Sequence, residues 1–396
     1  MNWRRPLAFA LAALACSQLA GCFSFRREAA RPGRTTLGSP LIVLPAQRLG
    51  TFLILESKWD RGGPWHFLID TGANTTLVTP EFAQRYGNKP DPATPVALVT
   101  IVAADGQTVE LPATTIRRLE LGDARFENIS ARIYDCAALS AHLGVKIDGI
   151  LGFPLFRETL LTLDYPRDRV VLAPNRGNPL IPGAAVPFNN ANKTPLISVR
   201  LGDQPFVALL DSGSDAALSL NPVGLSPHFT YGPREGSTVS TLAGDRSQSI
   251  GRLTESLNLA DYLLPAPIVE LSDELSAIGG AVLQNFSVTF DQERDRVTFY
   301  RDSPAPIATA PRRSPGLSFS KTPAYWRVAG VVPQSSAAAA AVERGDLITR
   351  INGEPVARWD FRRYARLVAE AREITFTFLN GTRETEKRLP VFELVP

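Results

Sequence analysis

Two short stretches of the chain place a carboxylate, a hydroxyl and a glycine in the same order after an apolar run. The first, FLIDTGA, contains Asp70, and the second, ALLDSGS, contains Asp211. Two carboxylates that share one proton can activate water for peptide hydrolysis. The ionised carboxylate accepts a proton from water, while the protonated one hydrogen-bonds the scissile carbonyl. Like charges this close lose their protons in two separated steps. The two stretches therefore indicate one catalytic pair.

The neighbours of the two aspartates fit such a pair. Thr71 and Ser212 carry hydroxyls that can bond backbone across an interface between two halves of the chain. Gly72 and Gly213 permit positive φ and let loop N–H groups approach the carboxylates closely. The residues expected to support the two loops are Thr71, Gly72, Ala73, Ser212, Gly213 and Ser214.

From about residue 40 to 302 the chain repeats itself, which weighs more than any single motif. Each half has a β-rich run ending in Asp-hydroxyl-Gly, then a glycine-bearing polar hairpin, an apolar-Gly element and a two-strand signature around a turn. The tetrapeptide Arg-Asp-Arg-Val recurs at 167–170 and 294–297. We therefore predict two copies of one mostly β lobe, residues 40–175 and 185–302.

Two further features of each half bear on the site. The apolar-Gly elements, 150–152 and 277–280, are expected to pack beneath the catalytic loops. The polar hairpins are placed to act as flaps over substrate and to exclude water. The flap residues expected to contact substrate are Asp105, Gly106, Gly244 and Asp245. The first half carries an insertion around 131–147, in which His142 and Lys146 are interpreted as surface residues.

Residues 40–302 resemble a pepsin/retropepsin-type aspartic peptidase, closest to bacterial retropepsin-like proteins with two copies per chain. The resemblance rests on WHFLIDTGA and FVALLDSGS in order with DGILG. It implies a bilobal, mainly β fold in which Asp70 and Asp211 are catalytic. It also implies that Asn74 and Asp215, two residues beyond each glycine, contact the substrate backbone.

The last eighty or so residues differ in character. GLSF at 316–319, followed by GDLITRINGEPV, resembles a PDZ domain in the form found in bacterial envelope proteases. The resemblance implies a small α+β domain that binds a peptide as an added strand. Its carboxylate-binding loop would be Gly316, Leu317, Ser318 and Phe319. The Pro- and Ala-rich stretch 303–315 is interpreted as a linker.

The N-terminus predicts export and acylation. A basic start, an apolar stretch from Leu7 to Ala15 and Leu-Ala-Gly-Cys at 19–22 are typical of a lipoprotein signal peptide, residues 1–21, with Cys22 as the lipidated residue. A plain secretory signal cut elsewhere is the alternative. Residues 22–39 would form a flexible tether. The mature protein would then be anchored to a membrane of the cell envelope, facing the periplasm, with the outer membrane favoured.

Composition excludes several function classes. Apolar residues make up 44% of the 396-residue chain and charged residues 20%, as in ordinary globular proteins. The net charge of +3 is too small and scattered to indicate nucleic-acid binding. None of the three histidines has metal-ligand spacing, so no metal site is predicted. After export, Cys136 would be left without an intrachain partner and is interpreted as a small packed residue.

The sequence thus predicts a lipid-anchored aspartic endopeptidase that hydrolyses extended polypeptide and needs neither a metal nor an organic cofactor. The PDZ-like module would recruit or gate substrate. Two alternatives stay open. One is a lipid-anchored peptide-binding protein with a vestigial aspartate pair, and the other is an enzyme whose lobes pair between chains. Because both halves are present in one chain, the sequence favours a monomer.

Overall fold

The computed structural model describes residues 33–89, 96–102, 108–177, 179–241, 244–322 and 324–396. The expected signal peptide and Cys22 lie outside these residues, as do the flap residues Asp105 and Gly106. In the described part of the chain, no helix is long and apolar enough to cross a membrane.

The first lobe is a set of strands whose side chains alternate between core and solvent. In β2, for example, the burial of successive residues alternates from Ile42 to Pro45, as expected for a strand with one buried face. Its elements are β1 (Arg34–Leu37), β2 (Ile42–Leu49), β3 (Phe52–Trp59), β4 (Gly62–Asp70), β5 (Thr76–Val78), α2 (Pro80–Tyr86), β6 (Leu98–Val102), β7 (Thr108–Leu121), β8 (Ala124–Ile133), α3 (Ala137–Leu143), β9 (Gly149–Gly152), η1 (Phe153–Phe156), β10 (Thr159–Asp164), η2 (Tyr165–Arg167) and β11 (Arg169–Pro174).

The second lobe repeats this plan with fewer helical insertions. Its elements are β12 (Ala184–Asn189), β13 (Leu196–Leu201), β14 (Gln204–Asp211), β15 (Leu218–Leu220), β16 (Phe229–Thr241), β17 (Gly244–Leu253), β18 (Leu257–Leu259), β19 (Tyr262–Leu264), β20 (Ile268–Leu271), β21 (Ala277–Gly279), α4 (Gly280–Leu283), β22 (Ser287–Asp291) and β23 (Arg296–Tyr300). The predicted hairpins are present as the antiparallel pairs β6–β7 and β16–β17.

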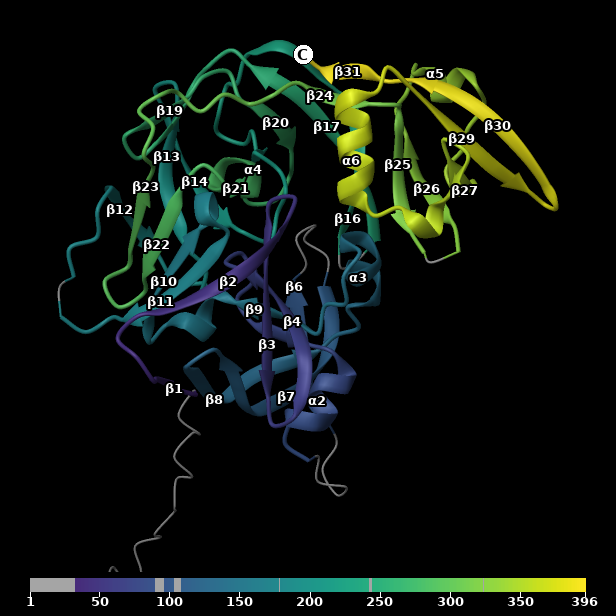
Figure 1. Cartoon of the computed structure of the whole chain (residues 1–396). Helices are drawn as coiled ribbons and strands as arrows, with labels where there is room; N and C mark the ends of the chain where they lie inside the picture. The colour runs from purple at the N-terminus through teal and green to yellow at the C-terminus, as the bar shows by residue number, and fades with distance from the viewer. Residues whose placement is uncertain (1–32, 90–95, 103–107, 178, 242–243, 323) are drawn as a thin grey trace, which may run out of the picture. The chain divides into compact units, whose positions relative to one another are not determined.

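The two lobes share one antiparallel sheet, in the order β2–β11–β10–β22–β23–β12. The seam is the β10–β22 pair, where Thr162 faces Thr289 and their hydroxyl oxygens lie 2.8 Å apart. The recurring Arg-Asp-Arg-Val segments form the turns beside this seam. Asp168 and Asp295 both adopt φ of 47°, so the repeated sequence makes the same backbone turn twice. Figure 1 shows β10, β11 and β22 side by side.

The largest apolar core runs through both lobes. Phe153 of the first lobe packs edge-on against Phe290 and Phe188 of the second, with ring centroids 5.3 and 5.8 Å apart. All three rings are buried. Truncating such a ring to alanine typically costs about 3–5 kcal/mol, so the lobes are held together by packing as well as by the shared sheet.

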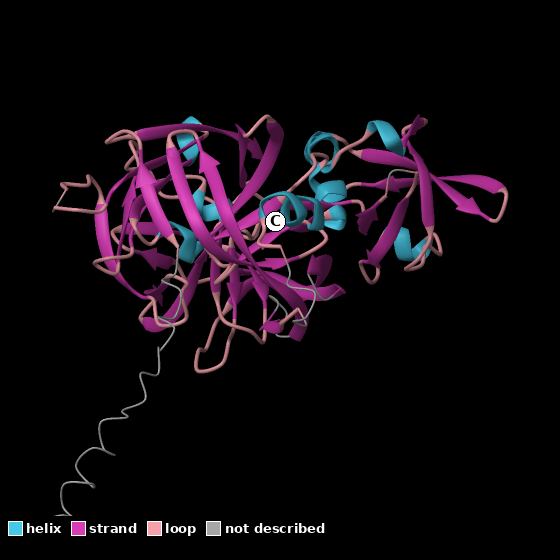
Figure 2. Ribbon diagram, turned by 90° about the horizontal axis from the view of Figure 1, so that it is seen from below, coloured by secondary structure: helices cyan, strands magenta, loops and turns pink. Residues whose placement is uncertain are grey.

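The C-terminal module, residues 312–395, has its own core around the buried Trp326, whose ring stacks on Phe361 at 5.0 Å. Figure 2 shows its strands and short helices beside the predominantly stranded lobes. Its elements are β24 (Arg312–Ser314), β25 (Leu317–Lys321), β26 (Trp326–Val331), α5 (Ser336–Ala339), β27 (Leu347–Ile351), β28 (Glu354–Pro355), η3 (Val356–Arg358), α6 (Phe361–Glu370), β29 (Glu373–Asn380), β30 (Arg383–Pro390) and β31 (Phe392–Val395).

Two segments differ from the sequence interpretation. Residues 34–37, assigned to a flexible tether, form β1 and pair with β8. Residues 312–314, assigned to the linker, form β24 and pair with β31. Ile307, also in the expected linker, is buried against the second lobe. In each case a segment of polar or Pro-rich composition is ordered by partners distant in sequence, which composition does not report.

Candidate active site

The two aspartates end equivalent strands. β4 ends at Asp70 and pairs in parallel with β9, placing Asp70 beside Gly152. β14 ends at Asp211 and pairs in parallel with β21, placing Asp211 beside Gly279. The expected elements 150–152 and 277–280 would align their last residues, Gly152 and Gly280, and this alignment is wrong by one position. The register shows that the first glycine of the Gly-Gly pair is the counterpart.

Four reciprocal hydrogen bonds join the two aspartate loops, 70–73 and 211–214, at their second residues. The Thr71 hydroxyl donates to the Leu210 carbonyl at 2.7 Å and accepts from the Ser212 N–H at 3.0 Å. The Ser212 hydroxyl donates to the Ile69 carbonyl at 2.9 Å and accepts from the Thr71 N–H at 3.0 Å. Both side chains are buried, so these bonds are not exchanged with water. The structure therefore contains the hydrogen bonds between lobes that the sequence predicted.

Loop amides hold each carboxylate. Asp70 Oδ1 accepts from the N–H groups of Gly72 and Ala73 at 2.9 and 3.0 Å. Asp211 Oδ1 accepts from the N–H of Gly213 at 2.8 Å. Each aspartate keeps part of its surface exposed. The carboxylates are thus fixed in orientation and still accessible to water.

Each glycine of the two loops faces the carboxylate of the other lobe. A Cβ on Gly72 would lie 2.6 Å from Asp211 Cγ, and one on Gly213 would lie 2.4 Å from Asp70 Cγ. Neither glycine has a positive φ, so the expectation of positive φ is wrong. The requirement for glycine comes instead from close approach, because any side chain would collide with the opposite aspartate.

The close approach of the carboxyls changes their protonation. Burial raises the pKa of Asp70 well above its usual value, and the charge of Asp211 raises it further. Burial also raises the pKa of Asp211, while N–H donors of the Gly213 loop and a hydrogen bond with Asp70 lower it. Two such groups titrate as a pair. The pair therefore retains one proton to a higher pH than an isolated carboxyl would.

The apolar-Gly elements support the loops from below. A Cβ on Gly152 would lie 2.4 Å from the Thr75 carbonyl, and one on Gly279 would lie 2.4 Å from the Ala216 carbonyl. Below the first loop, Asp148 is fully buried. Its Oδ2 accepts from the His66 N–H at 2.9 Å, which fastens β9 to β4. Asp148 opens the DGILG element, but no role for it is predicted from the sequence.

A second residue that the sequence analysis missed is Tyr165, at the start of η2. Its side chain is fully buried, and its hydroxyl has no hydrogen-bond partner in the described residues. Burial together with the charges of Asp211 and Asp70 raises the pKa of this phenol. A neutral hydroxyl therefore lies within electrostatic reach of both aspartates. Its position beside the repeated Arg-Asp-Arg-Val turn was the one sequence signal available.

The residues expected to contact substrate lie on separate elements. Asn74 and Asp215 are exposed beyond the two glycines. Gly244 and Asp245 open β17, opposite Thr241 and Ser240 of β16. Their roles in substrate binding stay predictions.

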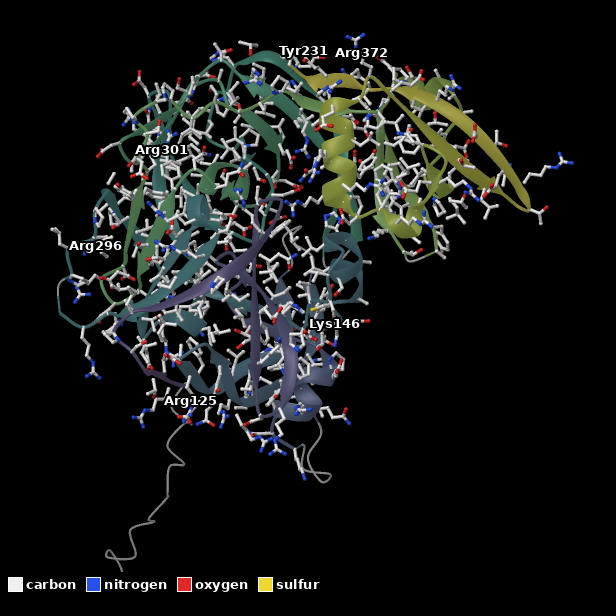
Figure 3. The ribbon with its side chains drawn as sticks, viewed as in Figure 1. Arg125, Lys146, Tyr231, Arg296, Arg301 and Arg372 are labelled. Atoms are coloured by element: carbon white, nitrogen blue, oxygen red, sulfur yellow. The ribbon has the colours of Figure 1, made fainter. Side chains whose placement is uncertain are left out.

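The two residues interpreted as surface groups of the insertion have partners. Lys146, labelled in Figure 3, pairs with Glu81 at 2.7 Å and with Asp148 at 3.0 Å. The His142 ring is half-buried and lies 4.2 Å from the Phe361 ring of the C-terminal module. The surface interpretation of His142 is therefore wrong, because its covering residue is more than two hundred positions away in sequence.

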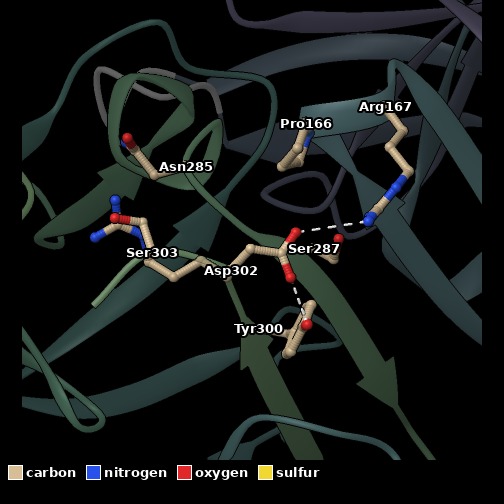
Figure 4. A pocket seen from close by; sticks show the side chains of 8 residues that line it. Pro166, Arg167, Asn285, Ser287, Tyr300, Asp302 and Ser303 are labelled. Carbon is tan, nitrogen blue, oxygen red and sulfur yellow. Dashed lines mark hydrogen bonds and ion pairs between the residues drawn. The ribbon is translucent and has the colours of Figure 1, made fainter. Parts of the chain in front are cut away.

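A pocket on the seam between the lobes has a different character. Figure 4 shows its polar lining, in which Asp302 accepts from the Tyr300 hydroxyl at 2.5 Å and pairs with Arg167 at 3.6 Å. Arg301, which also lines it, donates to the Ala305 carbonyl. These charged groups already bind one another or backbone, and no catalytic-loop residue lines the pocket.

In the C-terminal module, the expected carboxylate-binding loop, residues 316–319, begins at a glycine with positive φ and continues into β25. Gly316 has φ of +86°, and a Cβ there would lie 2.6 Å from Ser335 Oγ, so this position requires glycine. Leu317 and Phe319 are buried in the module's core, while Ser318 is half-buried between them. The loop's side chains thus support the strand. Because Leu317 and Phe319 point into the core, peptide contact by this segment is left to its backbone and to Ser318.

Comparison with known families agrees with both halves of this description. Residues 58–155 match the family model for an aspartyl protease, and residues 327–379 match the model for a PDZ domain. No curated protein matches the chain. The chain therefore carries an aspartyl-protease-type domain and a C-terminal PDZ domain. The protease match covers part of the first lobe, and the second lobe is related to it by the repeated elements and paired loops described above.

Proposed function

We propose that this protein is an aspartic endopeptidase that hydrolyses extended polypeptide with a water molecule activated between Asp70 and Asp211. The observation that carries the proposal is the reciprocal bonding of Thr71 and Ser212, which holds two proton-sharing carboxyls face to face. One chain supplies both halves of the pair, which supports a monomeric enzyme. The PDZ domain would recruit or gate the substrate.

In the proposed reaction, the ionised carboxylate accepts a proton as the water oxygen attacks the peptide carbonyl carbon. The protonated carboxyl meanwhile hydrogen-bonds the carbonyl oxygen, and a tetrahedral intermediate forms. The C–N bond then breaks as the peptide nitrogen receives a proton from the pair, which returns to its singly protonated state. Both carboxyls must be present, and the pair must hold one proton.

Hydrolysis of a denatured protein mixture from acidic to neutral pH tests the proposal. We expect Asp70→Asn and Asp211→Asn each to reduce cleavage by at least about a thousandfold, because each removes one partner of the proton exchange. Both variants should bind the mixture as well as the unaltered chain does. If the unaltered chain and both variants fail to cleave at every pH, the result would instead favour a peptide-binding protein with a vestigial aspartate pair.

We also propose that Cys22 is acylated and anchors the enzyme in the cell envelope, facing the periplasm. The proposal rests on the signal-like N-terminal sequence. Labelling cells with a radioactive fatty acid should mark the protein, and Cys22→Ser should abolish the label. A labelled Cys22→Ser protein would contradict the proposed anchor.

A further inference from the structure

The helix α3, in the first lobe's insertion, contacts the PDZ domain at the start of α6. The His142 ring lies 4.2 Å from the Phe361 ring, tilted by 31°. Gly144, which caps α3, abuts Asp360, since a Cβ on this glycine would lie 2.8 Å from Asp360 Cβ. Asp360 and Phe361 cap and begin α6. The helix therefore covers the N-terminal end of α6.

The same helix contacts β25, the strand at one edge of the PDZ sheet. β25 pairs with β26 on one side, and within the described residues no strand pairs with its other edge. A peptide that binds by strand addition uses such an unpaired edge. β16, the first strand of the second lobe's hairpin, also contacts β25. Elements of both lobes thus lie against the strand that a peptide would extend.

α3 is a weak element for such a position. It spans seven residues, and its N-cap Cys136 makes no side-chain cap bond. Isolated helices of this length are marginal in water, and segments of low local stability open most readily. Within the first lobe, the buried Cys136 and Leu143 hold it in a small apolar cluster. The Ser140 hydroxyl also donates to the Cys136 carbonyl at 2.7 Å and accepts from the Ile147 N–H at 2.9 Å.

Movement of α3 would displace the loop that carries Asp70. The chain passes from α3 to β9 within six residues, and β9 pairs with β4 as far as Asp70. Between them, Asp148 is fixed to the His66 backbone in both directions, with its N–H donating to the His66 carbonyl at 2.8 Å. A continuous covalent and hydrogen-bonded path thus links the edge of the PDZ domain to the first aspartate.

We propose that α3 occupies the peptide-binding edge of the PDZ domain, and that a substrate polypeptide adding to β25 displaces it and thereby shifts β9 beside Asp70. The part of this inference that concerns Asp70 rests on the proposed peptidase function. The occupied edge does not, because it concerns binding alone. The insertion in the first lobe then serves as an intramolecular cover for the binding edge.

Hydrogen exchange of the full chain in the Asp70→Asn background tests the inference without hydrolysis. The probe is a pool of random-sequence decapeptides with free C-termini. We expect the pool to protect β25 and to accelerate exchange in α3 by at least tenfold. His142→Ala should lower the pool concentration for the half-maximal change by about fivefold or more. His228→Ala is the matched control, since this exposed histidine pairs with Glu255 of the second lobe.

Unchanged exchange in α3 at saturating peptide would overturn the inference, whether or not β25 is protected. Equal half-maximal concentrations for His142→Ala and His228→Ala would overturn it as well. Near-ultraviolet circular dichroism checks that the His142→Ala variant is folded. If it is not, the exchange rate of α3 in the chain that retains His142 still tests the inference. A protein that shows the expected exchange but cleaves no substrate would refute the peptidase proposal and leave the occupied edge standing.

Discussion

The two lobes share one arrangement of strand, aspartate loop and glycine but differ in what has been added around it. Gly152 lies 82 positions after Asp70, whereas Gly279 lies 68 positions after Asp211. The first lobe uses the extra length to build α3, which meets the PDZ domain. The central loops meanwhile keep matching strands, hydrogen bonds and close-packed glycines. Symmetry is thus kept where two carboxyls must meet and is broken by the insertion that contains α3.

One pair of equivalent positions shows how the surroundings diverge. Strand β5 places Leu77 beside Arg132 of β8, and the counterpart β15 places Ser219 beside Glu270 of β20. Arg132 is half-buried and bonds neighbouring backbone, whereas Glu270 is buried. Burial raises the pKa of Glu270 to about 7, although the charge of Arg312 lowers it. The same place in the two lobes therefore holds a half-buried cation and a desolvated acid.

The comparison is tested most severely at the paired glycines. Gly72→Ala and Gly213→Ala each drive a methyl group into the opposite carboxyl, so we expect each to reduce peptide hydrolysis by about a thousandfold, near 4 kcal/mol. If the two loops are equivalent, the losses should agree within about tenfold. Hydrolysis assays of both variants measure this, and activity kept within threefold in either would show that the carboxyls do not act as a close pair.

Removing one hydroxyl from the interlobe bonds should have the next largest effect. Thr71→Val leaves the Leu210 carbonyl and the Ser212 N–H unbonded, and Ser212→Ala leaves the Ile69 carbonyl and the Thr71 N–H unbonded. Each buried unsatisfied group costs about 1–3 kcal/mol, so we expect a loss of about 3 kcal/mol in the free energy of unfolding. Urea unfolding measures it. A loss below about 1 kcal/mol would mean that water replaces these bonds.

Glu270→Gln tests the difference between the lobes through the pH dependence of the free energy of unfolding. The folded chain holds the Glu270 proton to about pH 7, whereas the unfolded chain releases it near pH 4.5. This residue's contribution to stability is therefore complete below pH 4.5 and is lost as pH rises through 7. Unfolding free energies should be equal at pH 4 and favour the variant by about 3 kcal/mol at pH 8.

The matched variant in the first lobe is Arg132→Gln. Because arginine stays charged throughout this range, its effect should not change between pH 4 and 8. A parallel pH dependence in both variants would show that the difference does not come from Glu270.

The smallest effect is expected from exchanging the residues after the two glycines. Ala73→Ser or Ser214→Ala, each made alone, gives both loops the same residue at this position. Ser214→Ala also loses one bond from the Ala216 N–H at 3.3 Å. We expect stability to change by about 1 kcal/mol or less and hydrolysis by less than threefold. Parallel unfolding and hydrolysis assays check this. A change above tenfold in either would give these positions a role in substrate binding that their size does not explain.

The central part of the candidate site could be predicted from sequence because its signals are local and duplicated. The order of Asp70, Thr71 and Gly72 after an apolar strand constrains a loop, and its repetition around Asp211 supplies a partner. The interlobe hydroxyl bonds follow from that duplication. The PDZ strands were likewise visible, because glycine and asparagine turns separate short apolar runs.

What the sequence did not reveal depends on partners distant along the chain. His142 has the character of an exposed residue until Phe361 covers it, and β1 that of a tether until β8 pairs with it. The need for Gly72 was recognised, but its cause is the opposite aspartate and not positive φ. Glu270 carries no local sign of burial. Long-range packing decides each of these, and periodicity within a segment does not record it.

The single α3 helix shows what a fused pair of lobes permits. An enzyme assembled from two identical subunits would carry any such helix twice, at both ends of its symmetry axis. A chain with both halves in one polypeptide can elaborate one side alone and leave the other unencumbered. A pseudo-symmetric enzyme can thus respond to binding on one side only. Under the proposal above, a peptide bound beside α3 affects the first lobe, and the corresponding surface of the second lobe can acquire a different function.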